Sequence, residues 1–173
     1  TLSRKIAKKY PENTNIWYPE WVAGSVILIQ RDFFKKIGKW SENKFWMYSE
    51  DPDICLKVRN NGKKIALLRN VELKHQHGGS SRKNTKTIAI TKSEVVTSSH
   101  VFIHVHTSGI NRVALHLVIM VNTLTSWLLR TIITLPFFWK VFFKANLLTL
   151  ITIIKYYLRV LIRGTWKSKR LKK

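Results

Sequence analysis

The second half of this chain is basic and apolar and contains no acidic residues. Glu94 is the last carboxylate, and residues 95–173 hold twelve Lys or Arg but no Asp or Glu. Three apolar runs fill this half, over residues 113–129, 131–139 and 145–162. A soluble pair of core helices rarely combines so much positive charge with no acid. The pattern therefore favours helices that contact an anionic membrane.

The apolar runs are marginal as membrane spans. A spanning helix needs about 20 apolar residues, and polar side chains interrupt the run at 113–129. Helices in the headgroup plane tolerate such interruptions, and Trp and Phe between residues 127 and 143 are typical of an interface. We therefore predict in-plane helices, with a helical hairpin broken near Pro136. A transmembrane span and a buried core pair are the alternatives.

The net charge of +22 is also typical of proteins that bind nucleic acid. The basic residues surround apolar helices and do not collect on one polar face, and no nucleic-acid-binding motif is recognisable. Anionic lipid explains the charge, so we expect an anionic membrane as partner and no nucleic acid. The excess of Lys and Arg places the flanks of the helices in the cytoplasm. The single cysteine, Cys55, fits a reducing compartment.

Three of the nine acidic residues fall within four positions, at Glu50, Asp51 and Asp53. Pro52 between them suits the first position of a helix, which makes Asp51 the N-cap. Gly62 suits the end of that helix, and Ile54, Cys55 and Val58 form its apolar stripe. A well-capped helix is one interpretation of this cluster. A general base held at a helix start is the other, and Asp51 can serve as both.

Strands and helices alternate in the predicted secondary structure of the first 110 residues. Strands are expected at 21–30, 64–68 and 71–77, helices at 31–37, 52–60 and 92–107, and a loop at 78–82. Gly38 ends the first of these helices. This alternation predicts an α/β sheet.

Four segments in this order resemble the family 2 glycosyltransferases. They are Gly24-Ser25, the sequence RDFFKKIG at 31–38, the sequence FWMYSEDPDIC at 45–55, and the sequence VELKHQHGGSSR at 71–82. The closest similarity is to the rhamnosyltransferase-like group that builds bacterial surface polysaccharides. The resemblance extends over residues 21–82, about a third of the chain.

The resemblance implies the second half of a GT-A enzyme. The expected fold is a partial, Rossmann-like α/β mixed sheet that lacks its nucleotide-binding half and is followed by membrane-associated helices. Residues 1–110 would form the acceptor-side part of the catalytic domain, and residues 111–173 the membrane-associated region. No Gly-rich phosphate loop and no Asp-x-Asp precede the acidic cluster. We therefore expect a fragment of a longer polypeptide that is inactive alone and works with the missing N-terminal half.

The resemblance also assigns roles to individual residues. Asp51 would be the base of an inverting transfer, and Glu50 would tune the site. A divalent metal, Mg or Mn, would neutralise the leaving diphosphate, with His75 or His77 as ligand. The substrate-binding candidates are Gly24, Trp46, Tyr48, Asp53 and Arg82. Packing is the alternative for Gly24, Trp46 and Tyr48, a solvated position for Arg82, and support of the helix start for Asp53.

The expected activity is transfer of a sugar from a nucleotide-diphosphate sugar to a glycan or lipid-linked acceptor, as in hexosyltransferases. Its expected place is the cytoplasmic face of the bacterial inner membrane. The alternative function is a non-catalytic membrane-binding or scaffolding domain. The remaining histidines are expected to face the membrane interface; they are His100, His104, His106 and His116.

Overall fold

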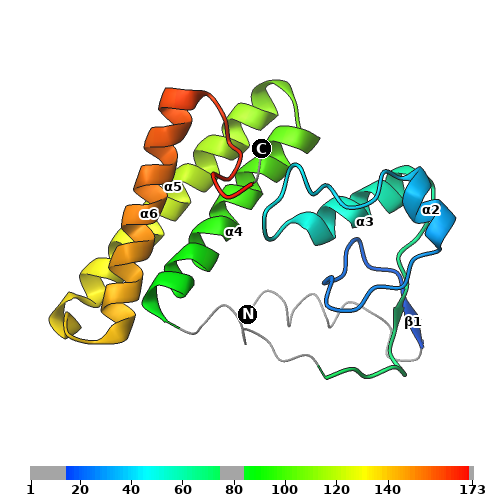
Figure 1. Ribbon diagram of the computed structural model, residues 1–173, viewed down its shortest axis with the longest axis horizontal. Coiled ribbons are helices and arrows are strands. Elements are labelled where there is room, and N and C mark those ends of the chain that lie inside the picture. The colour runs from blue at the N-terminus through cyan, green and yellow to red at the C-terminus, as the bar shows by residue number, and fades with distance from the viewer. Residues whose placement is uncertain (1–14, 75–83, 172–173) are drawn as a thin grey trace. The chain divides into compact units, whose positions relative to one another are not determined.

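The computed structural model describes residues 15–74 and 84–171 of the 173-residue chain. These residues form two compact units. The small unit contains residues 15–40 and 51–74, and the helical unit contains residues 41–50 and 84–171. Figure 1 shows both units, with the chain coloured from blue at its N-terminus to red at its C-terminus.

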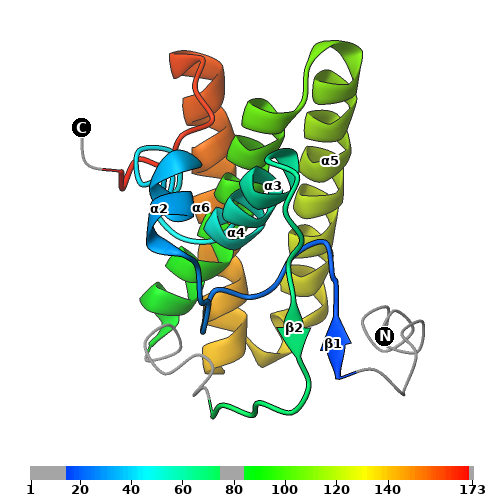
Figure 2. The same cartoon turned by 90° about the vertical axis from the view of Figure 1, so that its right-hand side faces the viewer.

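The predicted α/β mixed sheet is wrong. Among the described residues the only sheet has two antiparallel strands, β1 (Ile16–Trp17) and β2 (Leu67–Leu68), and most residues are helical. Figure 2 shows β1 beside β2. Ile16 lies opposite Leu68 and Trp17 opposite Leu67. The strand expected at 71–77 is absent from residues 71–74, and its remainder lies outside the described residues.

The apolar run at 21–30 does not form the expected buried strand. Its described backbone is irregular, with a turn at Gly24 and Ser25. Val22, Ile27 and Ile29 pack on the small hydrophobic core, whereas Leu28 is 99% exposed. A buried strand requires neighbouring strands for its N–H and C=O groups. No such neighbours lie beside this run in the described structure, so its apolar side chains pack against helix surfaces instead.

Two helices build the small unit, α2 (Arg31–Lys36) and α3 (Glu50–Asn60). Both were predicted, and both end at a glycine with positive φ: Gly38 follows α2 at +82° and Gly62 follows α3 at +71°. Glycine adopts this conformation without steric cost, which explains the sharp ends. The stripe of Ile54, Cys55 and Val58 is buried against Ile37, as predicted for an amphipathic helix.

Helix α3 begins two residues earlier than its sequence predicts. Glu50 is its first residue, so Asp51 lies inside the first turn instead of at the N-cap, and Pro52 is the third residue. Tyr48 and Ser49 precede it with φ of +70° and +64°. Two successive residues with side chains in the left-handed region are uncommon and store strain of order 1–3 kcal/mol each. The chain therefore turns sharply immediately before the acidic cluster.

Three long helices form the helical unit and lie side by side (Figure 1). They are α4 (Thr85–His106), α5 (Gly109–Ile133) and α6 (Val141–Arg163). The short 3-10 helix η1 (Leu135–Phe137) joins α5 to α6, and it contains Pro136. Proline cannot continue an α-helix, so the hairpin predicted near Pro136 is confirmed.

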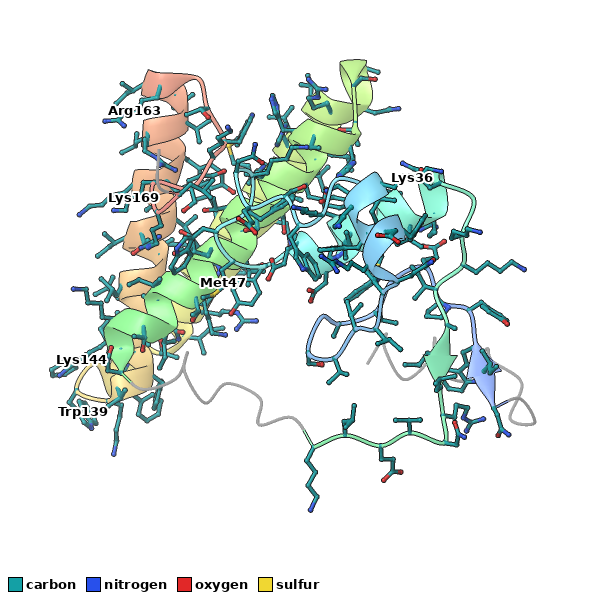
Figure 3. The ribbon with its side chains drawn as sticks, turned by 45° about the vertical axis from the view of Figure 1, so that its right-hand side comes forward. Lys36, Met47, Trp139, Lys144, Arg163 and Lys169 are labelled. Atoms are coloured by element: carbon teal, nitrogen blue, oxygen red, sulfur yellow. The ribbon has the colours of Figure 1, made fainter. Side chains whose placement is uncertain are left out.

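The core of the helical unit lies between α4, α5 and α6. Its buried members are Val96, Ile153, Tyr156, Tyr157 and Val160. After Gly164 ends α6, the C-terminal segment 165–171 returns over the helices. The Tyr156 hydroxyl donates to the Trp166 carbonyl at 3.1 Å, and Arg159 donates to the Lys167 carbonyl at 2.8 Å. Figure 3 shows Trp139 and Lys144 near the turn that begins α6 and Arg163 at its other end.

Helices α5 and α6 are long and apolar enough to cross a membrane. Both leave many large apolar side chains exposed, from Ile110 at 78% to Ile162 at 83%. Phe138 and Trp139 in the turn between them are more than half exposed. Contiguous apolar exposure on this scale marks a surface that contacts lipid or protein.

Candidate active site at the start of helix α3

The Asp51 carboxylate lies directly against the backbone of Gly24. A β-carbon at Gly24 would lie 2.0 Å from Asp51 Oδ1 and 2.8 Å from its Cγ, closer than any real side-chain contact. The approach requires a residue without a side chain, which explains glycine at position 24. Two separate segments of the sequence pattern, 24–25 and 45–55, therefore meet at one carboxylate. Asp51 itself is partly buried.

Asp53 faces the other way and has no exposed surface. Its Oδ2 lies 3.2 Å from Lys57 Nζ, one helical turn further along α3. Lys57 also donates to the carbonyl of Lys39 at 2.9 Å, which ties α3 to the segment after α2. These contacts give Asp53 a supporting role in holding the helix in place.

Tyr48 and Glu50 belong to segment 41–50, which is part of the helical unit. Glu50 is the first residue of α3 and is partly buried, as is Tyr48. The positive end of the helix favours negative charge at Glu50 and Asp51.

Trp46 lies in the helical unit. The guanidinium of Arg170 stands over its ring, 5.5 Å from the centroid. The Ser98 hydroxyl donates to the Met47 carbonyl at 2.5 Å, so the segment 41–50 is attached to α4. Trp46 is 39% exposed and retains a free part of its ring surface.

The residues predicted to bind metal lie outside the described residues. His75, His77 and Arg82 belong to segment 75–83. Among the described ranges 15–74 and 84–171, no group of three or more His, Cys, Asp or Glu could hold a metal ion. The Mg or Mn site therefore stays a prediction.

Cys55 is buried in α3 and free. Burial raises the pKa of its thiol, and the Asp51 charge adds to this, while a hydrogen bond with the Val22 backbone and the charge of Arg59 oppose it. A thiol with a raised pKa is a poor nucleophile. Cys55 therefore packs as a core residue next to the site.

Two of the four histidines expected at a membrane interface are buried, so that prediction is wrong for them. His100 has no exposed surface and His116 is 7% exposed. Their Nδ1 atoms are 2.7 Å apart, and His100 Nε2 lies 3.0 Å from the Tyr157 hydroxyl. The indole of Trp166 stacks on both rings, at centroid distances of 4.6 and 4.0 Å. This cluster joins α4, α5 and α6 to the C-terminal segment.

Sequence reasoning missed this cluster and a buried ion pair. Glu94 Oε1 pairs with Arg170, and it accepts a hydrogen bond from the Ser168 hydroxyl at 3.0 Å. Glu94 is 2% exposed. One signal was present in the sequence: Glu94 is the only acid of its helix. Its partner 76 residues away could not be identified from local pattern.

No model of a known protein family matches this sequence, and neither a curated protein nor a solved structure shows significant similarity to it.

Proposed function

We propose that this chain supplies the acceptor side of a membrane-associated glycosyltransferase, with Asp51 as the general base. The reaction is transfer of a sugar from a nucleotide-diphosphate sugar to a glycan or lipid-linked acceptor. The place of action is the cytoplasmic face of the bacterial inner membrane. The observation that carries the proposal is the close approach of the Asp51 carboxylate to Gly24, because it joins two segments of the transferase-like sequence pattern.

The chemistry assigned to Asp51 is removal of a proton from the acceptor hydroxyl. As the bond between the sugar and the diphosphate breaks, the hydroxyl oxygen attacks the anomeric carbon from the opposite face, and Asp51 takes its proton. A base must lie within hydrogen-bond reach of that hydroxyl. Asp51 is partly exposed in the first turn of α3, which supports the assignment. The metal ligand is assigned to His75 or His77, which lie outside the described residues.

Membrane attachment is assigned to the hairpin of α5 and α6. The exposed apolar side chains of both helices would enter the headgroup region, and the aromatic turn at 137–139 would sit at its boundary. Lys155 lies near the middle of α6, and Arg159 lies one turn before its end. Charges near the centre of a bilayer are costly. These cations support the in-plane arrangement over a span.

The test is transfer activity in membranes from cells that carry the complete gene, with Asp51→Asn as the variant. A positioned base contributes roughly 10²–10⁴-fold to rate, so turnover should fall by that factor while nucleotide binding changes little. Asp32→Asn is the matched control, because Asp32 is an exposed aspartate in the first turn of α2. Near-normal turnover in Asp51→Asn would restrict Asp51 to a structural role.

The second candidate is a non-catalytic membrane-binding or scaffolding module. The exposed apolar surface of α5 and α6 favours it, since that surface needs no chemistry to be useful. Absence of transfer in wild-type membranes, together with retained membrane binding, is the result expected for this candidate.

A further inference from the structure

We propose that a cationic pocket between α4, α6 and the C-terminal segment binds a phosphate group. The pocket has a volume of about 300 Å³. Five cations line it, two from α6, two from the C-terminal segment and one from α4: Lys86, Lys155, Arg159, Lys169 and Arg170. Glu94 is the only acid among its described lining residues. The net charge of the lining is therefore 5 − 1 = +4.

The Glu94–Arg170 pair lines this pocket and does not neutralise it. The two charges cancel each other, and the Ser168 hydroxyl fixes the carboxylate. The Arg170 backbone N–H donates to the same hydroxyl at 3.1 Å. Glu94 therefore holds the C-terminal segment as a wall of the pocket. Four cations remain to meet a ligand.

None of these four cations forms an ion pair with a carboxylate in the part of the chain that the structure describes; they are Lys86, Lys155, Arg159 and Lys169. Arg159 uses one nitrogen on the Lys167 carbonyl, and its other donors remain available. Concentrating unpaired cations around one cavity costs free energy through mutual repulsion, and an anion relieves that cost.

The hydroxyl groups that line the pocket already donate their hydrogens within the protein, so the pocket would recognise a ligand mainly by its charge. Thr97 and Thr152 donate to backbone carbonyls of their own helices, and Tyr156 donates to Trp166. Their hydrogens are already used, so the ligand must accept hydrogen bonds mainly from ammonium and guanidinium groups. Phosphate offers several acceptor oxygens and more than one negative charge, and Lys and Arg are its usual partners.

Two sources of phosphate suit this pocket, a lipid headgroup and a free phosphorylated molecule. Exposed apolar residues of α6 adjoin Lys155 on the helix surface, at Ile151, Leu158 and Ile162. Residues three, four and seven positions apart share a helix face. An acyl chain could therefore lie along α6 while the headgroup occupies the pocket. The inference depends on neither Asp51 nor sugar transfer.

The first experiment measures pyrophosphate binding to the purified full chain by calorimetry at about 0.15 M salt, where exposed charges more than about 8 Å apart are screened. Lys155→Gln with Arg159→Gln should weaken binding by about tenfold or more. Lys144→Gln with Arg163→Gln is the matched control, since it removes one Lys and one Arg from exposed positions of α6 outside the pocket. Lys169→Gln, at an exposed position, is a second pocket variant with little risk to folding.

The second experiment distinguishes a lipid headgroup from a soluble molecule as the source of the phosphate group. Vesicles with phosphatidic acid are compared with vesicles of equal charge made with phosphatidylglycerol. Preference for phosphatidic acid that the pocket variants lose identifies a lipid headgroup. Pyrophosphate binding without such a preference identifies a soluble phosphate. Equal losses of binding in the pocket and control variants would show that the pocket is not a phosphate site. The same would follow if the wild type bound neither pyrophosphate nor phosphatidic acid.

Discussion

At the scale of single residues, Gly24 and Asp51 form the contact on which the candidate site depends. Gly24→Ala places a methyl group where the Asp51 carboxylate now lies. We expect overpacking to lower the free energy of unfolding by about 1–3 kcal/mol. The displaced carboxylate should also lose transfer activity to nearly the same extent as Asp51→Asn. Chemical denaturation and transfer assays measure the two effects.

A double variant separates steric displacement from general damage. Gly24→Ala combined with Asp51→Ala removes the clash, so it should recover most of the stability that Gly24→Ala loses and none of the activity. Ser25→Ala, at the exposed neighbouring position, should leave both unchanged. If Gly24→Ala keeps full activity, the close approach has no bearing on catalysis.

His100 makes the helical unit sensitive to acid. Burial, and then the nearby His116, lower the pKa of His100 from 6.5 to about 4. The unfolded chain therefore binds more protons than the folded chain between those values. Stability is fully present above pH 6.5 and is lost as the pH falls toward 4, by about 3 kcal/mol at the lower end. The burial of His116 lowers its own pKa and acts in the same direction.

Thermal unfolding across pH 4–7 checks this expectation. His100 faces His116 on α5 and Tyr156 and Tyr157 on α6, so the neutral variant His100→Gln should flatten the pH slope while lowering stability at pH 7. His106→Gln, near the end of α4, should keep the wild-type slope. An unchanged slope in His100→Gln would exclude His100 as the acid-sensitive group.

At the scale of elements, helix α4 begins with a complete capping box. The Asn84 side chain accepts from the Thr87 N–H at 2.9 Å, and the Thr87 hydroxyl accepts from the Asn84 N–H at 3.1 Å. Asn84→Ala should therefore cost about 1 kcal/mol. Ser108→Ala is the natural control, because Ser108 is the N-cap of α5 but its side chain makes no capping hydrogen bond. Denaturant titration should show little change in the free energy of unfolding of Ser108→Ala. Equal losses in the two variants would mean that the Asn84 cap does not stabilise α4.

Elements that depend on residues adjacent in the sequence could be predicted. Elements that depend on contacts between distant parts of the sequence could not. Helices α2 and α3 end at Gly38 and Gly62, and the hairpin turns at Pro136, because glycine and proline act on their own backbone. The strand expected at 21–30 failed because an apolar run does not reveal whether it will meet strands or helices. Asp51 was singled out by the acidic cluster and by the family resemblance, and its role stays a prediction. Its contact with Gly24 and the His100–His116 cluster depend on the folded arrangement.

At the scale of the whole molecule, the surface of the α5–α6 hairpin should decide where the protein resides. We expect it to bind anionic vesicles peripherally, through apolar burial and through the exposed cations Lys167 and Lys169. Replacing both lysines with glutamine should weaken binding mainly at low salt, because screening already reduces their contribution at high salt. The side-chain ammonium groups of both lysines lie outside the hydrogen bonds that attach the C-terminal segment.

Leu161→Glu tests the apolar part of the same binding. Leu161 is 81% exposed near the end of α6, so a charge at this position should leave the fold intact. It should reduce vesicle flotation several-fold, because the desolvation of a carboxylate opposes insertion into the membrane. Asn43→Glu adds the same charge at an exposed loop position and should float like wild type. Release of the wild type by carbonate washing fits the in-plane arrangement. Resistance to carbonate would require α5 and α6 to span the bilayer, and failure of the wild type to float would mean that a protein partner covers their apolar surface.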